Sequence, residues 1–469
     1  MDHPTPAPGP TTLGGLRGSG VTTGPVKAEI RANLMSRLRA GEPAFPGIVG
    51  FDDTVLPQLE RALLAGHDVV LLGERGQGKT RLIRTLVGLL DEWSPYVTGC
   101  EIGDDPYAPV CARCVLLAAE LGDLLPVAWR HRSQRYGEKL ATPDTSVGDL
   151  IGDVDPIKVA EGRTLGDPET IHYGLVPRTH RGIFSVNELP DLAERIQVAL
   201  LNVLEERDIQ VRGYALRLPL DLLLVASANP EDYTNRGRII TPLKDRFGAE
   251  VRTHYPLRLD DELAMIRQEA VLPADVTVPE HVLECIARFT RLVREAPQVD
   301  ARSGVSARFA IASAETVAAS AVRRAALTGE PSPTARVVDL PSAVTSSRGK
   351  VEFDQLEEGR ENEILLHLLR RAVADTFRAR LTGADLAGLV ARFDDGGTVE
   401  SGELVPAEEL LRRIGPVAGL AQLLGRLGVH EGQETPGQAA AALELAMEGL
   451  HLNKRLSKDE LPGRTVYGA

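Results

Sequence analysis

The chain has 469 residues, of which 43% are hydrophobic, 25% charged and 4% aromatic. This composition is typical of a globular protein long enough for roughly three domains of about 150 residues each, and it excludes a fibrous or wholly disordered chain. The formal net charge of -13 opposes binding of nucleic acid by the surface as a whole, since phosphate binding depends on clustered Lys and Arg.

The amino-terminal segment predicts a disordered tail over residues 1–25. It is rich in Pro, Gly and Thr and lacks the apolar core of a signal peptide. No later run approaches the roughly 18 apolar residues that a membrane span needs. We therefore expect a cytoplasmic protein without a membrane span.

From residue 26 to residue 258, strand-like apolar runs alternate with amphipathic segments. The runs "DVVLLG", "GIFSVNE" and "LDLLLVASANP" are the clearest strands. Such alternation predicts an α/β domain with a doubly wound parallel sheet and helices on both faces. Alternating residues about Gly213 predict a β-hairpin within this domain.

The stretch "GERGQGKT" carries the strongest motif of the chain, because it matches the P-loop pattern and lies between a predicted strand and a predicted helix. Backbone N–H groups of such a loop cradle the β- and γ-phosphates of a nucleotide, the lysine neutralises them, and the hydroxyl after it ligates Mg²⁺. The motif therefore predicts ATP and Mg²⁺ as ligands. The residues expected to bind the nucleotide are Gly73, Glu74, Arg75, Gly76, Gln77, Gly78, Lys79 and Thr80, with Thr80 also on the metal.

Three cysteines follow in "GCEIGDDPYAPVCARC", at Cys100, Cys111 and Cys114. A Cys-x-x-Cys pair with a third thiolate is a plausible part of a structural zinc site, which usually has four tetrahedral ligands. The candidates for a fourth ligand are His131, Asp104 and Asp105, whereas Cys285 lies in another predicted domain. The alternative is three reduced cysteines without metal.

The next strand ends in an amide and a carboxylate, Asn187 and Glu188. In P-loop ATPases a second strand ends beside the phosphates, where its last residue steadies the Mg²⁺ shell and an adjacent carboxylate polarises the attacking water. We expect Glu188 to be that carboxylate. Asn187 brings no negative charge to the metal but can accept a hydrogen bond from a metal-bound water, so we expect weakened Mg²⁺ affinity. The same pair also suits the start of a helix.

A third polar strand end is Asn229, which is expected to position the hydrolytic water. Arg246, in "TPLKDRFGAEV", is expected at the edge of the nucleotide-binding domain. It either forms a buried pair with Asp245 or reaches the γ-phosphate of a neighbouring subunit as an arginine finger.

The remaining chain is predominantly helical. Residues 259–330 predict an all-α lid domain, in which Arg308 begins a helix and is either a γ-phosphate ligand or an ordinary surface arginine. Residues 331–350 have the Pro and Ser content of a linker, although "ARVVDL" suits a short strand. Apolar residues at three- and four-residue steps predict a further helical region over residues 351–469.

Taken together, these segments resemble AAA+ ATPases of the helix-2-insert clade, and most nearly the ATPase (I) subunit of magnesium chelatase and MoxR-type ATPases. The segments "FPGIVG", "GERGQGKT", "LIGDVDP", "LVPRTHRGIFSVNE", "SANPED", "LKDRFG" and "SARF" follow the order seen in that clade, from Phe45 to Glu330. The resemblance implies these roles: Walker A for residues 73–80, Walker B for Asn187 and Glu188, sensor 1 for Asn229, the arginine finger for Arg246, sensor 2 for Arg308, and an adenine contact for Ile48 and Val49. Asn187 replaces the usual Walker B aspartate.

The resemblance also implies a ring ATPase, hexameric in form, which works with a partner bearing a von Willebrand factor A domain. We expect ATP hydrolysis that remodels or activates a protein partner, with metal insertion into a client as one form of that work. One alternative is a nucleotide-dependent scaffold in which Asn187 has reduced hydrolysis. The other is an AAA+ transcription activator, although neither an aromatic-tipped loop nor a basic helix-turn-helix is evident.

Overall fold

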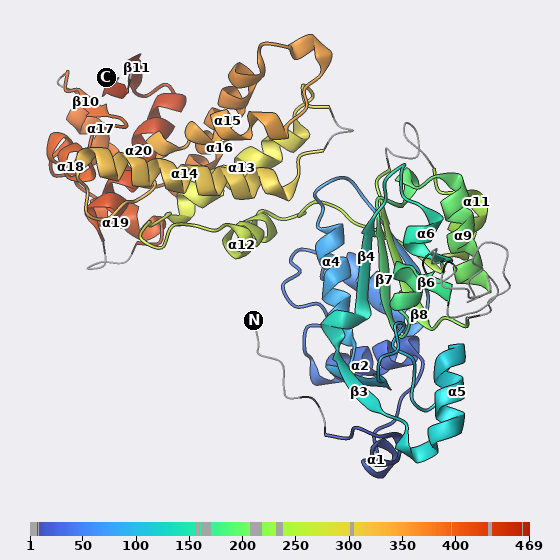
Figure 1. Cartoon of the computed structure of the whole chain (residues 1–469). Coiled ribbons are helices and arrows are strands. Elements are labelled where there is room, and N and C mark those ends of the chain that lie inside the picture. The colour runs from blue at the N-terminus through green and yellow to red at the C-terminus, as the bar shows by residue number, and fades with distance from the viewer. Residues whose placement is uncertain are drawn as a thin grey trace. The chain divides into compact units, whose positions relative to one another are not determined.

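The computed structural model describes residues 7, 9–154, 157, 160, 170–206, 218–230, 238–300, 304–394, 396–429, 434–461 and 463–469. The chain forms two compact units, Met1–His254 and Tyr255–Ala469 (Figure 1). Each unit has its own buried hydrophobic residues.

The first unit is built on a five-stranded parallel sheet with strand order β4-β7-β8-β1-β9. The strands are β1 (Val69–Leu72), β4 (Tyr136–Leu140), β7 (Gly182–Asn187), β8 (Leu222–Ala228) and β9 (Ala249–Arg252). β1, β7 and β8 are buried along their whole length, as strands covered on both faces must be, which explains their unbroken apolar runs. Because neighbouring strands are parallel, their carboxyl ends meet at one edge of the sheet.

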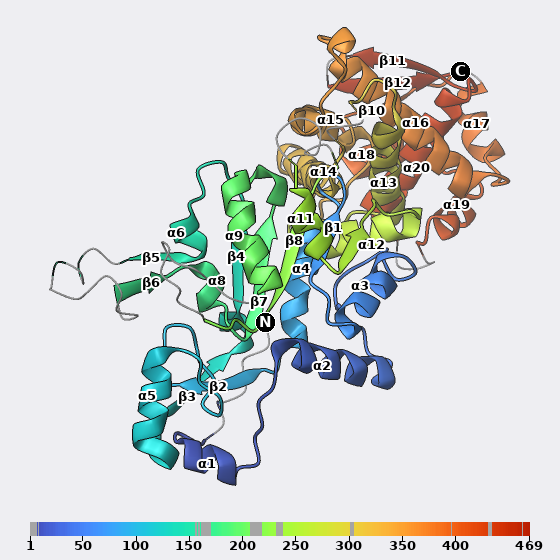
Figure 2. The same cartoon turned by 90° about the vertical axis from the view of Figure 1, so that its right-hand side faces the viewer.

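Alternate residues of these strands point into two different cores. Ile183 and Val225 pack in one core with α2 (Val26–Ala40), α3 (Val55–Leu64) and α4 (Lys79–Thr85). Phe184 and Leu224 pack in the other with α6 (Val147–Leu150), α8 (Leu175–Arg178), α9 (Glu194–Glu205) and α11 (Thr241–Arg246). Figure 2 shows α4 and α9 on opposite sides of the sheet. The predicted α/β fold with a doubly wound parallel sheet is confirmed.

An insertion before β4 adds a two-stranded antiparallel sheet, β2 (Trp93–Val97) with β3 (Val127–His131). The segment between them carries α5 (Ala112–Leu121) and the three cysteines. A second antiparallel pair joins β5 (Gly152–Val154) to β6 (Ile171–Tyr173). The hairpin predicted about Gly213 lies outside the described residues.

The prediction of a disordered tail over residues 1–25 is wrong for its central part. Leu13–Gly18 forms helix α1, with the Thr12 side chain accepting a hydrogen bond from the Gly15 N–H at its start. Leu13 and Leu16 are buried, and the Leu13 N–H donates to the Leu125 carbonyl at 3.0 Å. The two buried leucines and these hydrogen bonds hold a short helix that the Pro- and Gly-rich composition did not predict.

The second unit is mainly helical. Its helices are α12 (Leu259–Glu269), α13 (Glu280–Glu295), α14 (Ala307–Thr328), α15 (Ser342–Ser347), α16 (Glu361–Leu381), α17 (Ala387–Asp394), α18 (Ala407–Ile414), α19 (Leu420–Arg426) and α20 (Pro436–Leu452). Short 3-10 helices in the two units are η1 (Leu86–Leu89), η2 (Gly122–Leu124), η3 (Arg132–Arg135), η5 (Leu189–Asp191), η6 (Val337–Asp339), η7 (Arg348–Lys350) and η8 (Gln355–Glu357). A single hydrophobic core runs through the unit. The helical character predicted for this part is confirmed.

Two details of this unit differ from the sequence prediction. Residues 331–350 are not a linker, because Val337 of η6 and Val344 of α15 are buried, and Asp339 forms a buried ion pair with Arg324 at 3.1 Å. The carboxy-terminal region also contains an antiparallel sheet of order β10-β12-β11, with β10 (Val399–Ser401), β11 (Ser457–Leu461) and β12 (Arg464–Gly468). No division separates residues 259–330 from 351–469, since both contribute to the one core. Among the described helices, none is both long and apolar enough to cross a bilayer.

Candidate active site

The P-loop lies between β1 and α4, as its sequence predicts. Gly76 and Gly78 have φ angles of 74° and 76°, a left-handed conformation that favours glycine. A Cβ atom on Gly73 would lie 2.0 Å from Thr253 Oγ1, so that position also requires glycine. The Gln77 side chain accepts a hydrogen bond from Thr253 Oγ1 at 2.8 Å, which ties the loop to the end of β9. The glycines and Gln77 of the motif therefore determine the conformation of the loop.

Lys79, the first residue of α4, is buried although it is charged. Its Nζ donates to the carbonyls of Gly73 and of Glu74, the latter at 2.8 Å. It also donates to Asn229 Oδ1 at 2.8 Å. The ammonium group is thus held across the mouth of the loop and joined to the end of β8.

Two polar residues that follow strands, Asn229 after β8 and Glu188 after β7, lie beside Lys79. Asn229 is buried after β8, and its Nδ2 donates to Glu188 Oε2 at 2.5 Å. Glu188 has a φ angle of 56°, which is uncommon for a residue with a side chain and is stabilised by a hydrogen bond from its N–H to Ser227 Oγ at 3.2 Å. Lys79, Asn229 and Glu188 therefore form one hydrogen-bonded chain, which we call the Lys–Asn–Glu chain.

Asn187, at the end of β7, has a carboxylate neighbour that the sequence did not reveal. Its Nδ2 donates to Glu138 Oε1 at 2.6 Å, and its Oδ1 accepts from Ser227 Oγ at 3.3 Å. Arg84 holds Glu138 through two hydrogen bonds of 2.9 and 3.0 Å and thereby lowers the pKa of the Glu138 carboxyl below its ordinary value. An ionised carboxylate thus lies beside the position where Walker B aspartate is expected. Glu138 is in β4, and only the pairing of β4 with β7 identifies it.

This contact predicts the effect of restoring the aspartate. Asn187→Asp is expected to destabilise the first unit by about 1–3 kcal/mol without nucleotide, because a hydrogen-bond donor to an ionised carboxylate becomes a second carboxylate. Thermal unfolding measures the change. The double variant Asn187→Asp/Glu138→Gln restores one donor and should recover most of the stability, so a single variant as stable as the natural chain would contradict the interpretation.

The remaining residues of the predicted site fall into two groups. Ile48, Val49 and Thr80 are half-buried in the first unit, and Ile48 packs against the core beneath α2 and α3. Arg308 is exposed near the start of α14 in the second unit, so its part in a phosphate site stays a prediction. Arg246 lies in the first unit and has two carboxylate partners.

Arg246 is the last residue of α11. Its guanidinium contacts Glu205 and Asp245, each at 2.8 Å, and its side chain is 38% exposed. The expected alternative of a buried Asp245–Arg246 pair is wrong in one respect, because the pair exists but lies at the surface. An exposed guanidinium remains able to exchange these partners for another anion.

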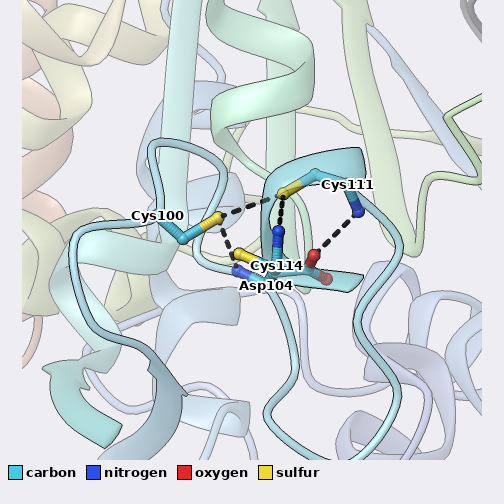
Figure 3. A group of neighbouring side chains, drawn as sticks. All are labelled: Cys100, Asp104, Cys111 and Cys114. Carbon is cyan, nitrogen blue, oxygen red and sulfur yellow. Dashed lines mark hydrogen bonds between the residues drawn. The ribbon is translucent and has the colours of Figure 1, made fainter. Parts of the chain in front are cut away.

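The three cysteines of the β2–β3 insertion lie together (Figure 3). Of the proposed fourth ligands, Asp104 joins them, whereas His131 is hydrogen-bonded to Ser133 Oγ at 2.8 Å and Asp105 accepts from the Tyr107 N–H. The structure therefore groups neither His131 nor Asp105 with the three cysteines. Cys285 is buried in the second unit.

Comparison with known proteins shows what the chain resembles. No family model matches it. The magnesium-chelatase 38 kDa subunit of Acidiphilium rubrum is 30% identical over 217 residues, covering 44% of this chain and 57% of that protein. The same subunit of Rhodobacter capsulatus is 29% identical over 248 residues, covering 50% of this chain and 63% of that protein. This chain thus spans less than two thirds of the length of either relative.

Among solved structures, a complex between subunits BchI and BchD of magnesium chelatase is similar over 69% of this chain and 98% of that chain, with 22% identity and a TM-score of 0.37. The sequence relatives confirm the expected resemblance to the magnesium-chelatase ATPase subunit, and the fold agrees with an AAA+ ATPase. The likeness to MoxR-type ATPases stays a prediction.

Proposed function

We propose that this chain hydrolyses ATP as a ring-forming AAA+ ATPase and thereby remodels or activates a protein partner. The observation that carries the proposal is the Lys–Asn–Glu chain, which joins a phosphate-binding cation to a carboxylate at one edge of the sheet. The similarity to magnesium-chelatase subunits supports it. A strained, left-handed Glu188 fits a catalytic role, because such backbone strain concentrates at functional sites.

In the proposed reaction, Lys79 and the N–H groups of the P-loop hold the β- and γ-phosphates. A water oxygen bonds to the γ-phosphorus while the bond from that phosphorus to the ADP oxygen breaks, and Glu188 accepts the proton of the water. Asn229 orients the Glu188 carboxylate through the hydrogen bond at 2.5 Å. Ile48 and Val49 are proposed to contact the adenine.

The residues proposed to hold Mg²⁺ are Thr80 and Asn187. Hydroxyl and amide oxygens suit this ion, which keeps several of its waters. The Glu138 carboxylate beside Asn187 is paired with Arg84, so it replaces only part of the negative charge that an amide lacks. When bound, the ion neutralises charge on the phosphate oxygens. We therefore expect the asparagine to weaken the metal site without abolishing hydrolysis.

Steady-state phosphate release tests the proposal against the scaffold alternative, which Asn187 favours. An ATPase releases phosphate continuously in the presence of ATP and Mg²⁺, whereas a scaffold assembles with ATP and releases almost none. Light scattering on the same samples reports the assembly. Assembly with ATP but without phosphate release would overturn the enzymatic assignment.

Arg246 is proposed to act on the γ-phosphate bound by a neighbouring subunit. Arg246→Ala is then expected to lower phosphate release by about 10³-fold or more while nucleotide binding is kept, since arginine fingers contribute about 10³–10⁵ to the rate. Arg258→Ala, which also removes an exposed ion-paired arginine, is the matched control. Mixing Arg246→Ala with Glu188→Gln subunits should restore part of the phosphate release, because the first variant keeps Glu188 and the second keeps Arg246. A mixture as inactive as either variant alone would contradict action between subunits.

The ring size, the partner and the location are further parts of the proposal. We expect a hexamer, a protein partner with a von Willebrand factor A domain, and a cytoplasmic location. Affinity isolation of the intact chain with ATP, followed by identification of co-purifying proteins, tests the partner. Recovery of such a protein only when ATP is present supports the proposal, and recovery of none opposes it.

A further inference from the structure

The cysteine cluster lies in the segment that connects β2 to β3. Cys100 follows β2, whereas Cys111 and Cys114 belong to the start of α5 (Figure 3). The three thiols are free, Cys111 and Cys114 are buried, and Asp104 is fully buried beside them. One ligand atom from each of these four residues lies within 4.8 Å of every other. Four side chains that can bind a metal, from residues up to 14 positions apart in the sequence, thus lie close together.

The spacing of the sulfur atoms fits a tetrahedral ion better than a disulfide. Cys100 Sγ and Cys111 Sγ are 3.9 Å apart. Two sulfurs bound to zinc at about 2.3 Å and at the tetrahedral angle are roughly 3.8 Å apart, whereas a disulfide requires about 2.05 Å. Three thiolates and one carboxylate complete the four ligands that a structural zinc site usually has.

The surrounding charges point to the same conclusion. Arg130 is 7% exposed, and among the described residues it contacts carbonyl oxygens and no carboxylate; its Nε has no hydrogen-bond partner. A buried cation without a counter-charge is strongly destabilising. Three thiolates, one carboxylate and Zn²⁺ carry a net charge of about -2, which would supply a counter-charge for Arg130.

We propose that Cys100, Cys111, Cys114 and Asp104 bind one structural Zn²⁺ ion. The ion fastens the insertion to the amino end of β7, because Asp105 forms an ion pair with Arg181 at 3.6 Å and Arg130 donates to the His180 carbonyl at 2.7 Å. These residues lie at the opposite end of β7 from Glu188, roughly 20 Å away for a six-residue strand. The site therefore braces the sheet and takes no part in hydrolysis, and the inference does not depend on the proposed function.

Elemental analysis of the full chain, purified with a reductant and without chelators, tests the proposal. We expect about one zinc per chain, loss of that zinc in Cys114→Ser, and its retention in the matched control Cys285→Ser. X-ray absorption at the zinc edge should show three sulfurs at about 2.3 Å and one oxygen at about 2.0–2.2 Å. Absence of zinc from the purified chain, together with no uptake of added Zn²⁺ by the reduced protein, would overturn the proposal, as would full retention in Cys114→Ser.

Asp104 needs its own test, because its carboxylate also accepts hydrogen bonds from the N–H groups of Val110 and Cys111. Competition with a chromogenic chelator should show at least about tenfold weaker zinc binding in Asp104→Asn. A chelator added to the natural chain should lower the melting temperature of the first unit, since removal of a ligand bound only to the folded state destabilises it. Unchanged zinc affinity in Asp104→Asn would remove Asp104 from the site, and an unchanged melting temperature after zinc removal would contradict the bracing role.

Discussion

Glu188→Gln is expected to lower steady-state phosphate release by about 10²–10⁴-fold, because glutamine cannot accept the proton of the attacking water. Nucleotide binding should be kept. The glutamine oxygen can still accept the hydrogen bond from Asn229 Nδ2, so the contact between Asn229 and Lys79 need not change. Phosphate release and calorimetric nucleotide affinity, measured on the same preparation, separate these two effects.

Glu194→Gln is the matched control for this variant, since Glu194 is an exposed glutamate at the start of α9. It should release phosphate at the rate of the natural chain. A Glu188→Gln variant with undiminished turnover would show that another group takes the proton. Loss of nucleotide affinity together with turnover would instead indicate that the substitution disturbs the P-loop.

The site was predictable where phosphate chemistry restricts the residues in a continuous stretch. The glycines and Lys79 of the P-loop are such a case, because a left-handed turn and a buried ammonium leave few other choices. Asn187, Glu188 and Asn229 were predictable as polar residues that end apolar strands. The contact between Glu188 and Asn229 followed from a general property of parallel sheets and not from any detail of the sequence.

Other parts of the molecule could not be predicted because their evidence is not local. Glu138 lies in "YGEKL", which carries no motif, and it reaches Asn187 only because β4 pairs with β7. Asp104 was one of three candidate ligands until the loop geometry selected it.

The same limitation applies to the second unit. Residues 331–350 have a linker composition, yet the Arg324–Asp339 ion pair fixes them in the core. The strand "SKDEL" of β11 is largely exposed and lacks alternating apolar residues, so its sequence does not predict a strand. Both features depend on contacts with residues distant in sequence.

Lys79→Ala is expected to weaken nucleotide binding by about 100-fold or more, since a charge-assisted hydrogen bond to phosphate contributes about 1.5–3 kcal/mol and this ammonium group can make more than one. Phosphate release should fall with it. The variant also removes the three hydrogen bonds that Lys79 Nζ donates to the carbonyls of Gly73 and Glu74 and to Asn229 Oδ1. The P-loop therefore loses contacts that hold its shape.

Arg31→Ala, which removes an exposed cation from α2, should bind nucleotide normally in the same titration. If calorimetry with Mg²⁺ detects no nucleotide binding to the natural chain, or equal binding to Lys79→Ala, the loop is not a nucleotide site and the proposed ATPase activity fails with it.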